Sequence, residues 1–417
     1  MDRPKMSAAA ASFLPDDALV EILSWLPAKS LCQFKCVSKA WRDLIADRLH
    51  CKKLPEGLAG FFLNDGDEMP GGGGGGGVGK DRVVGHLVNT LGRFMPLASV
   101  SFLGKQKGIK EFSLLHSCNG LLLLGHRRHR DIYDSLGYIV CNPATEQWVV
   151  VPNSGWKPFS LSGVEVIEDL DSYNEPRSRF AYLIFDPAVS SHFRLVEFWM
   201  WTDNVQFVEE LHTYSSVTEV WTRCSRTEVW GLDKDVVISF FAGSALVNRM
   251  LHFSVTGVGT GQKLIFAIDG QGRECRFISG PEKRADVAFV GQSQGRLHYM
   301  TQHRDSTSEM TKLSIWVLQD YDAEEWVLKH SVTFLQLFGR MNCDVEFDYK
   351  VVAIHPDRNL IFFVQRWDLK LKSYDMDSKE VCTLRILGFG PQNIVPYVPY
   401  FAESSTLAKM HWNNCAL

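Results

Sequence analysis

Five polar turns recur along most of the 417-residue chain, each lying between two apolar runs. They begin near Asn142, Tyr214, Asp269, Asp320 and Asp375, so the last four lie 55, 51 and 55 residues apart. A regular spacing close to 50 residues is typical of proteins built from stacked repeats, and a propeller blade takes about 40 to 50 residues. The spacing therefore predicts a repeated unit whose last two strands are joined by the polar turn.

The apolar runs between these turns are continuous rather than alternating. Examples are Gly120 to Gly125, Leu313 to Leu318 and Leu360 to Val364. A strand with one solvated face alternates apolar and polar residues, so continuous runs indicate strands that are covered on both faces. We expect four-stranded units that stack face to face, as propeller blades do.

Five units can be recognised in the sequence, and a sixth is expected where Val83 to Leu103 pairs with Ile394 to Phe401 near the C-terminus. Such a pairing joins the two ends of the β domain. The wide gap after the first turn is attributed to an insertion at Pro152 to Arg179. A tryptophan begins the outermost strand in three units, where packing between blades is the expected role; these are Trp148, Trp221 and Trp326.

The N-terminal segment from Ser12 to Asp47 has a different pattern, that of three short amphipathic helices. Apolar residues recur at helical spacing in the first helix, at Leu19, Ile22, Leu23 and Leu26. Ser38 is placed to cap the third helix. The segment has about forty residues, which is near the lower size limit for independent folding. It carries more apolar surface than it can bury, which indicates that it binds a partner.

This segment resembles an F-box: Leu-Pro, an acidic pair, Ile-Leu, a second Leu-Pro and a basic-x-Trp ending occur in order, from Leu14-Pro15 to Lys39-Ala40-Trp41. The resemblance implies binding to the small Skp-type adaptor of a cullin–RING ubiquitin ligase. The alternative is a helical cap on the domain that follows. The expected adaptor contacts are Leu14, Pro15, Leu19, Ile22, Leu23, Leu26, Pro27, Leu31, Phe34, Val37 and Trp41.

The repeated region is similar to the F-box-associated domain common in plant F-box proteins, in motifs spread over Lys110 to Leu387. They include His116 to Leu124, Asn142 to Thr145, Phe185-Asp186-Pro187 and His355-Pro356. The predicted fold class is therefore α+β multidomain, a three-helix F-box before an all-β, propeller-like domain. The expected parts are a disordered 1–11, an F-box at 12–55, a flexible glycine-rich segment at 64–81, the β domain at 83–405 and a tail at 406–417.

The glycine-rich segment, with seven consecutive glycines from Gly71 to Gly77, is interpreted as a flexible tether. Gly74 to Lys80 also fits the start of a phosphate-binding loop. Asp81 then replaces the serine or threonine that would bind magnesium, and no helix signal follows. Nucleotide binding is therefore not expected.

The net charge and the distribution of cysteines limit the possible ligands and the cellular location. A net charge of −4 gives no support to nucleic-acid binding. The ten cysteines are scattered without a disulfide framework, and no secretory signal or membrane-length apolar run is present. We expect cytoplasm, nucleus or both.

Three patterns imitate catalytic or metal sites. Gly291 to Gly295 spells the Gly-x-Ser-x-Gly of a nucleophile elbow, but the strand-like Arg296 to Met300 follows, so Ser293 is assigned to a hairpin turn. Cys32 and Cys36 lack further ligands at zinc spacing. The acidic residues from Glu165 to Asp171 are assigned to a solvated insertion. No catalytic residue, cofactor or metal is predicted.

The sequence thus predicts a non-catalytic substrate receptor whose F-box binds the adaptor and whose β domain binds a target protein. A scaffold that binds the adaptor without ubiquitination of a target remains an alternative, and a propeller enzyme ranks last. Long polar loops are plausible target contacts, at Arg127 to Asp134, Trp156 to Arg179 and Arg304 to Glu309. The target itself is not predicted.

Overall fold

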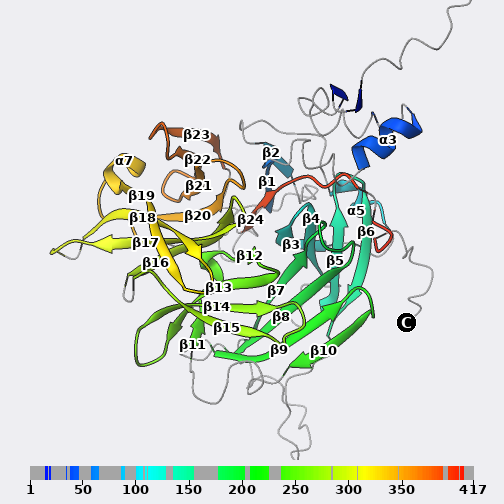
Figure 1. The fold of residues 1–417 in the computed structure, drawn as a ribbon, viewed down its shortest axis with the longest axis horizontal. Coiled ribbons are helices and arrows are strands. Elements are labelled where there is room, and N and C mark those ends of the chain that lie inside the picture. The colour runs from blue at the N-terminus through cyan, green and yellow to red at the C-terminus, as the bar shows by residue number, and fades with distance from the viewer. Residues whose placement is uncertain are drawn as a thin grey trace, which may run out of the picture.

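The computed structural model describes residues 15–16, 18–19, 34, 38–46, 58–64, 86–89, 100–106, 109, 111–127, 135–154, 177–201, 207–224, 236–282, 285–307, 309–345, 347–387, 393–402 and 404–407. Six antiparallel sheets lie around a common centre, and the chain passes from one to the next in order (Figure 1). The fold is a six-bladed β-propeller, so the predicted sixth unit is confirmed.

The blades are numbered here in chain order. Blade 1 holds β3 (Glu111–Cys118), β4 (Leu121–Arg127), β5 (Ser135–Asn142) and β6 (Gln147–Pro152). Blade 2 holds β7 (Arg177–Phe185), β8 (Phe193–Trp201), β9 (Phe207–Ser215) and β10 (Val220–Cys224). Blade 3 holds β11 (Val236–Ile238), β12 (Ala245–Val247), β13 (Met250–Gly257), β14 (Lys263–Asp269) and β15 (Cys275–Ser279); β11 and β12 both pair with β13 and are separated by the 3-10 helix η1 (Phe240–Ala242).

Blade 4 holds β16 (Asp286–Ser293), β17 (Arg296–Arg304), β18 (Met310–Asp320) and β19 (Glu325–Thr333). The short helix α7 (Phe334–Phe338) leads to blade 5, which holds β20 (Tyr349–Ile354), β21 (Leu360–Gln365), β22 (Lys370–Asp375) and β23 (Val381–Ile386). Blade 6 consists of β24 (Asn393–Tyr397), β1 (Gly60–Asn64) and β2 (His86–Asn89). Outside the blades lie α3 (Lys39–Ala46) and α5 (Ser101–Gly104).

All five predicted turns join the last two strands of a blade, which confirms the repeat. In three of them the aspartate that ends the third strand accepts backbone N–H bonds from the turn, as Asp320 does from Asp322 and Ala323 at 2.9 and 2.8 Å. These side chains stabilise the turn locally. The turns also place a residue at positive φ shortly before the outer strand: Glu146, Glu219, Glu324 and Lys379.

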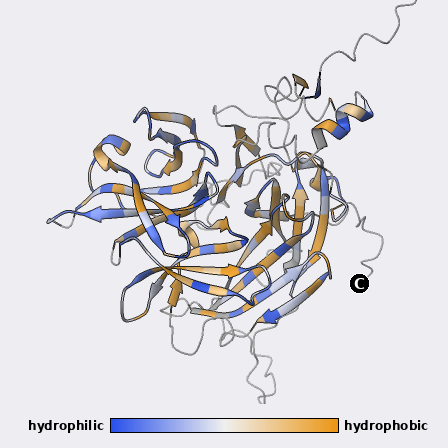
Figure 2. Cartoon of the chain, in the orientation of Figure 1, coloured by the Kyte–Doolittle hydropathy of each residue, from blue (hydrophilic) through white to orange (hydrophobic). Residues whose placement is uncertain are grey.

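The continuous apolar runs are strands buried on both faces, as predicted. Leu121 to Leu124 in β4 and Ile361 to Phe363 in β21 are at most 1% exposed. Figure 2 shows hydrophobic residues along the strands of every blade, with hydrophilic residues more frequent at the outer edge. Because neighbouring blades cover both faces of each sheet, alternation is absent from these strands.

Two of the three predicted tryptophans also tie neighbouring blades together by a hydrogen bond. Trp221 Nε1 donates to the carbonyl oxygen of Pro152 at 2.8 Å, and Trp326 Nε1 donates to that of Ser279 at 2.8 Å. In each case the acceptor lies at the end of the outermost strand of the preceding blade. Their role in packing between blades is therefore confirmed.

Blade 6 joins the two ends of the domain, but not by the expected direct pairing. β24 pairs with β1, and β1 in turn pairs with β2, so β1 lies between the two segments that were expected to pair. Figure 1 shows β24 beside β1 at the centre of the ring. The interpretation of the glycine-rich segment as a tether between two domains is wrong, because both strands that flank it belong to this blade.

The segment after β24 continues across blades 1 and 2. Leu407 is buried, Asn142 Nδ2 donates to the Tyr400 carbonyl at 2.8 Å, and Ser404 N donates to Gln147 Oε1 at 2.9 Å. A Cβ on Gly120, which has a φ of 90°, would lie 2.2 Å from Tyr400 Cβ. Glycine is thus required where this segment crosses the β3–β4 turn.

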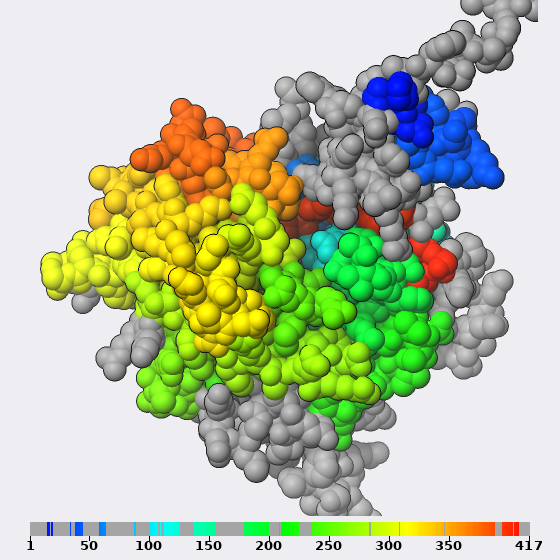
Figure 3. All heavy atoms as spheres, in the orientation of Figure 1, coloured from blue at the N-terminus to red at the C-terminus, as the bar shows by residue number. Residues whose placement is uncertain are grey.

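The antiparallel order gives the ring two different faces. The connections between first and second and between third and fourth strands lie on one face and are mostly short, such as 119–120 and 294–295; we call it the tight-turn face. The connections between second and third strands and between blades lie on the other, long-connection face, and include 153–176 and 334–348. Figure 3 shows the blades packed side by side in chain order around the ring.

Candidate functional site

The described part of the N-terminal helical segment has the predicted local structure. Trp41 N donates to Ser38 Oγ at 3.1 Å, so Ser38 caps α3 as expected. The rings of Phe34 and Trp41 lie with centroids 5.2 Å apart, and Leu19 is half-buried. Backbone bonds from Ala18 and Leu19 to the Pro15 carbonyl begin a helical turn there.

The structure thus describes four of the expected adaptor contacts: Pro15, Leu19, Phe34 and Trp41. The other seven lie outside the described residues and stay predictions: Leu14, Ile22, Leu23, Leu26, Pro27, Leu31 and Val37. Cys32, Cys36, Gly74 to Lys80 and Glu165 to Asp171 also lie outside them.

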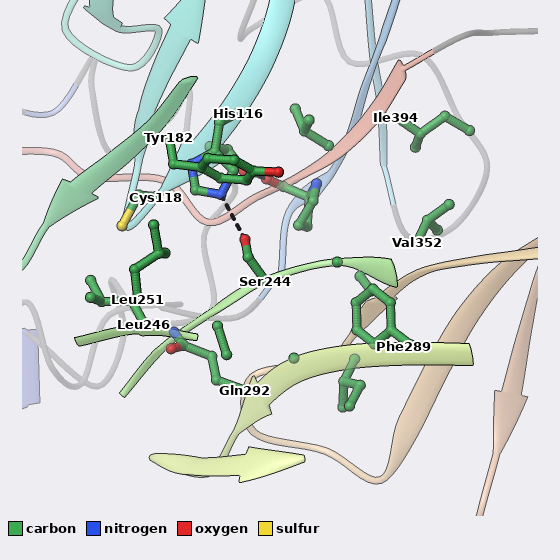
Figure 4. Close-up of a pocket in the computed structure, with 18 of the residues that line it drawn as sticks. His116, Cys118, Tyr182, Ser244, Leu246, Leu251, Phe289, Gln292, Val352 and Ile394 are labelled. Atoms are coloured by element: carbon green, nitrogen blue, oxygen red, sulfur yellow. Dashed lines mark hydrogen bonds between the residues drawn. The ribbon is translucent and has the colours of Figure 1, made fainter. Parts of the chain in front are cut away.

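A cavity of about 480 Å³ follows the centre of the ring and is lined by the innermost strands. Its walls are mainly apolar, with Leu246, Leu251, Phe289, Val352 and Ile394 among them (Figure 4). The described lining contains no aspartate or glutamate. A cavity of this size and composition can hold a small molecule or a side chain of a partner.

His116 is the central polar group of this cavity. Its Nδ1 accepts the backbone N–H of Leu183 at 3.2 Å, so the ring proton is on Nε2, which lies 3.3 Å from Ser244 Oγ (Figure 4). Burial lowers the pKa of His116 to about 4, which keeps the ring neutral at pH 7. His116 therefore joins the innermost strands of blades 1 and 2 to the residue that precedes β12.

The other reactive groups of the cavity are not activated. Burial raises the pKa of Cys118 to about 12 and raises that of Tyr182 further, so both side chains are protonated at pH 7. A nucleophile requires a lowered pKa or an adjacent base with a free lone pair. Neither pKa is lowered, and Nδ1 of His116, whose ring lies beside that of Tyr182, already accepts the Leu183 N–H.

The serine of the apparent nucleophile elbow is also structural. β16 ends at Ser293, Gln294 and Gly295 form a turn with φ of 51° and 69°, and β17 follows. Ser293 Oγ donates to the His355 carbonyl at 2.7 Å, between blades 4 and 5. The hairpin assignment is confirmed.

A buried carboxylate that the sequence did not single out joins blades 1 and 2. Glu197 is 0% exposed, accepts the Trp199 Nε1 proton at 3.1 Å and accepts a hydrogen bond from the Tyr138 hydroxyl. Arg179 and His212 lie 3.9 and 3.7 Å from it. A lone glutamate within the otherwise apolar run from Leu195 to Trp201 was the available signal. Nowhere in the described ranges do three His, Cys, Asp or Glu residues form a group that could hold a metal.

Exposed aromatic side chains gather on the long-connection face. Phe347 is 83% exposed, Trp367 40% and Met341 39%, and the Arg340 guanidinium lies 3.6 Å from the Trp367 ring centroid. Arg340 also pairs with Asp348, whose carbonyl accepts the Arg366 N–H at 2.8 Å. We call Arg340, Met341, Phe347 and Trp367 the rim patch; aromatic, methionine and arginine side chains are enriched in protein interfaces.

All three loops expected to contact a target lie partly outside the described residues. Their flanking strands nevertheless end on the long-connection face. The rim patch was missed because its residues come from two separate connections, 334–348 and 366–369, and only the fold brings them together. None of the helices that the structure describes is long and apolar enough to cross a membrane.

Comparisons with known proteins agree with this architecture. A family model described as "F-box protein At3g26010-like, beta-propeller" matches residues 82–386, and an F-box domain model matches residues 12–53. F-box protein At5g49610 of Arabidopsis thaliana is 23% identical over 80% of this chain and 83% of its own. Putative F-box/kelch-repeat protein At1g15680 of the same plant is 24% identical over 88% of this chain and 82% of its own.

Proposed function

Because the chain belongs to the At3g26010-like family of F-box β-propeller proteins, we propose that it is the substrate-recognition subunit of an SCF-type (Skp adaptor–cullin–F-box) ubiquitin ligase. In this role the F-box binds the adaptor and the propeller binds a target protein. In this role the chain itself catalyses no covalent bond formation. It raises the effective concentration of target lysines near the ubiquitin-charged enzyme that other subunits bring.

The observation that carries the proposal is the opposite placement of two features on the ring. The chain enters β1 from the tight-turn face, because Gly60 pairs with Tyr397 at the end of β24, and the F-box match ends shortly before, at residue 53. The rim patch and the long connections lie on the other face. This arrangement favours a bridging subunit, with the target held on the face away from the F-box attachment.

The adaptor contact is tested with the double variant Leu23→Ala/Leu26→Ala in the full-length chain. Both residues belong to the predicted apolar stripe of the first F-box helix, and each truncation removes apolar contact area from the interface. We expect the variant to lose co-purification with adaptor and cullin while its propeller unfolds at an unchanged temperature. Leu335→Ala on α7, where the side chain is 59% exposed, is the matched control. Retention of adaptor by the double variant contradicts the proposal.

A scaffold that binds the adaptor without ubiquitination of a target is the second candidate. The two candidates are distinguished by the half-life of captured proteins in cells with and without this chain. A substrate receptor shortens that half-life, whereas a scaffold leaves it unchanged. Propeller enzymes of the glycosidase or lactonase type rank lower, because the described cavity lining holds no carboxylate and one neutral histidine.

A further inference from the structure

The central cavity has polar side chains at both of its ends and mainly apolar walls between them. Arg179 and Lys350 lie at the end on the long-connection face, because each comes early in the first strand of its blade. Gln292 lies toward the tight-turn face, because it is the last residue but one of β16. A molecule in the cavity therefore meets two cations at one end and an amide at the other.

The mouth on the long-connection face combines these cations with aromatic rings. The rings of Phe180 and Phe240 are stacked with centroids 4.2 Å apart, and the ring of Phe241, which is 55% exposed, lies edge-on to that of Phe180 at 6.1 Å. Lys350 Nζ lies 5.9 Å from the ring centroid of Phe241. Aromatic rings beside cations suit a flat apolar molecule with a negative charge at one end.

Arg179 is held in place from outside the cavity. Its guanidinium lies 3.9 Å from the carboxylate of the buried Glu197 and 4.8 Å from the ring centroid of Trp199. Neither of these two residues is part of the cavity lining. The described lining contains no carboxylate, so an anion at the mouth meets N–H donors of Arg179 and Lys350 and no acid that repels it.

The opposite end of the cavity contains an acceptor that is not satisfied. Gln292 Oε1 is buried and has no hydrogen-bond partner among the residues that the structure describes. Figure 4 shows this side chain in the cavity wall. A buried amide oxygen without a partner costs free energy, and a hydroxyl or N–H group of a ligand would remove that cost.

The distance between the two ends favours a small molecule over a side chain of a target protein. The Ser293 hydroxyl donates to the His355 carbonyl at 2.7 Å, so these two positions lie at one level. Gln292 therefore lies near the level of Ile354, which follows Lys350 by four residues in β20. At about 3.3 Å per residue the two ends are about 13 Å apart. One side chain inserted at the mouth would leave Gln292 unsatisfied, whereas a molecule with two rings reaches both ends.

We propose that the central cavity binds a flat, mainly apolar carboxylic acid that carries a hydroxyl group at its far end. The carboxylate lies at Lys350 and Arg179, and the hydroxyl donates to Gln292 Oε1. The apolar body lies against walls that include Leu246 and Val352 (Figure 4). The volume of about 480 Å³ is within the range of about 300–1,000 Å³ of small-molecule sites. This inference concerns the propeller alone and does not depend on the proposed function.

The test compares three probes by isothermal titration calorimetry at pH 7 with the full-length chain. 6-Hydroxy-2-naphthoic acid has a carboxylate and a hydroxyl at opposite ends of a flat body of two rings. 2-Naphthoic acid lacks the hydroxyl, and the neutral 2-naphthol lacks the carboxylate. We expect the hydroxy acid to bind about fivefold or more tightly than 2-naphthoic acid and about tenfold or more tightly than 2-naphthol.

Two variants assign each end of the probe to a residue. In Lys350→Gln the preference for the hydroxy acid over 2-naphthol should shrink, while its preference over 2-naphthoic acid stays. In Gln292→Leu the opposite should hold. Lys312→Gln makes the same charge change as Lys350→Gln at an exposed position of β18 outside the cavity, and should bind all three probes like wild type. Comparison of probes within one variant separates these contacts from general effects on stability, and thermal unfolding verifies that each variant is folded.

Three results overturn the inference: no saturable binding of the hydroxy acid to wild type, equal affinity for all three probes, or unchanged preferences in both cavity variants. If no probe binds but Lys350→Gln loses a target that wild type captures, the cavity receives a side chain of the target and the small-molecule assignment is wrong. The titrations need neither adaptor nor target, so their failure is distinct from retention of the adaptor by Leu23→Ala/Leu26→Ala.

Discussion

At the residue scale, three buried histidines make the stability of the propeller depend on pH. Burial lowers the pKa of His116, His252 and His298 to about 4 each. In the unfolded chain these rings titrate near 6.5. Between pH 6.5 and 4 the unfolded state therefore binds more protons than the native state, and stability is lost as the pH falls through this window. Above pH 6.5 their contribution is fully present.

His116→Asn tests this at one site, since the amide oxygen can replace Nδ1 as the acceptor for Leu183 N–H. Each such histidine contributes up to about 1.4 kcal/mol per pH unit to the slope of the unfolding free energy within the window. We expect the variant to be less stable at pH 7 but to lose less stability between pH 6.5 and 5, as measured by urea unfolding. The exposed His192, changed to Asn, is the control; a slope in His116→Asn equal to wild type argues against the prediction.

At the scale of the element, the outer strands depend on the tryptophan bonds between blades. Trp326→Phe keeps the aromatic packing but removes the donor to the Ser279 carbonyl, so the free energy of unfolding should fall by about 1 kcal/mol. Trp326→Ala also removes the ring and should cost about 3–5 kcal/mol. Chemical unfolding measures both. Equal losses in the two variants would assign the whole effect to the hydrogen bond and none to the packing of the ring.

The repeat could be predicted from sequence because its signals are local. A turn such as the one after Asp320 is stabilised by its own side chain, and Ser38 caps α3 through a residue three positions away. β1 was not predicted, because five residues before a glycine-rich stretch carry little pattern and gain their place only by pairing with β24, far along the chain. Long-range pairing of this kind is invisible to periodicity.

The residues of the candidate site also differ in whether their signals are local in the sequence. The F-box contacts follow from helical spacing within one short segment, whereas the rim patch combines residues from different connections. Glu197 shows the same limit: its partners Tyr138 and Arg179 come from other strands, so its burial could not be inferred from FRLVEFWMW alone.

At the scale of the whole molecule, ring closure depends on the C-terminal strand. A chain that ends at residue 392 lacks β24, so β1 loses its inner partner and the core loses Tyr397, which is 1% exposed. We expect such a chain to lose its cooperative thermal transition and to aggregate. A chain that ends at residue 407 keeps β24 and the buried Leu407 and should unfold like wild type. A cooperative transition in the shorter chain would contradict closure by β24.

The two-faced ring also makes a prediction for target binding. Interface energy is concentrated in a few aromatic and arginine side chains, so Phe347→Ser/Trp367→Ser should remove target capture while the F-box still binds adaptor. Val189, 56% exposed in the β7–β8 connection of the tight-turn face, supplies the control Val189→Ser. Ubiquitinated proteins are compared after capture by wild type, both variants and Leu23→Ala/Leu26→Ala. Ubiquitinated proteins that are captured by wild type but not by Leu23→Ala/Leu26→Ala should also be absent after capture by Phe347→Ser/Trp367→Ser, and they should be present after capture by Val189→Ser. If Phe347→Ser/Trp367→Ser still captures them, the target binds elsewhere on the ring.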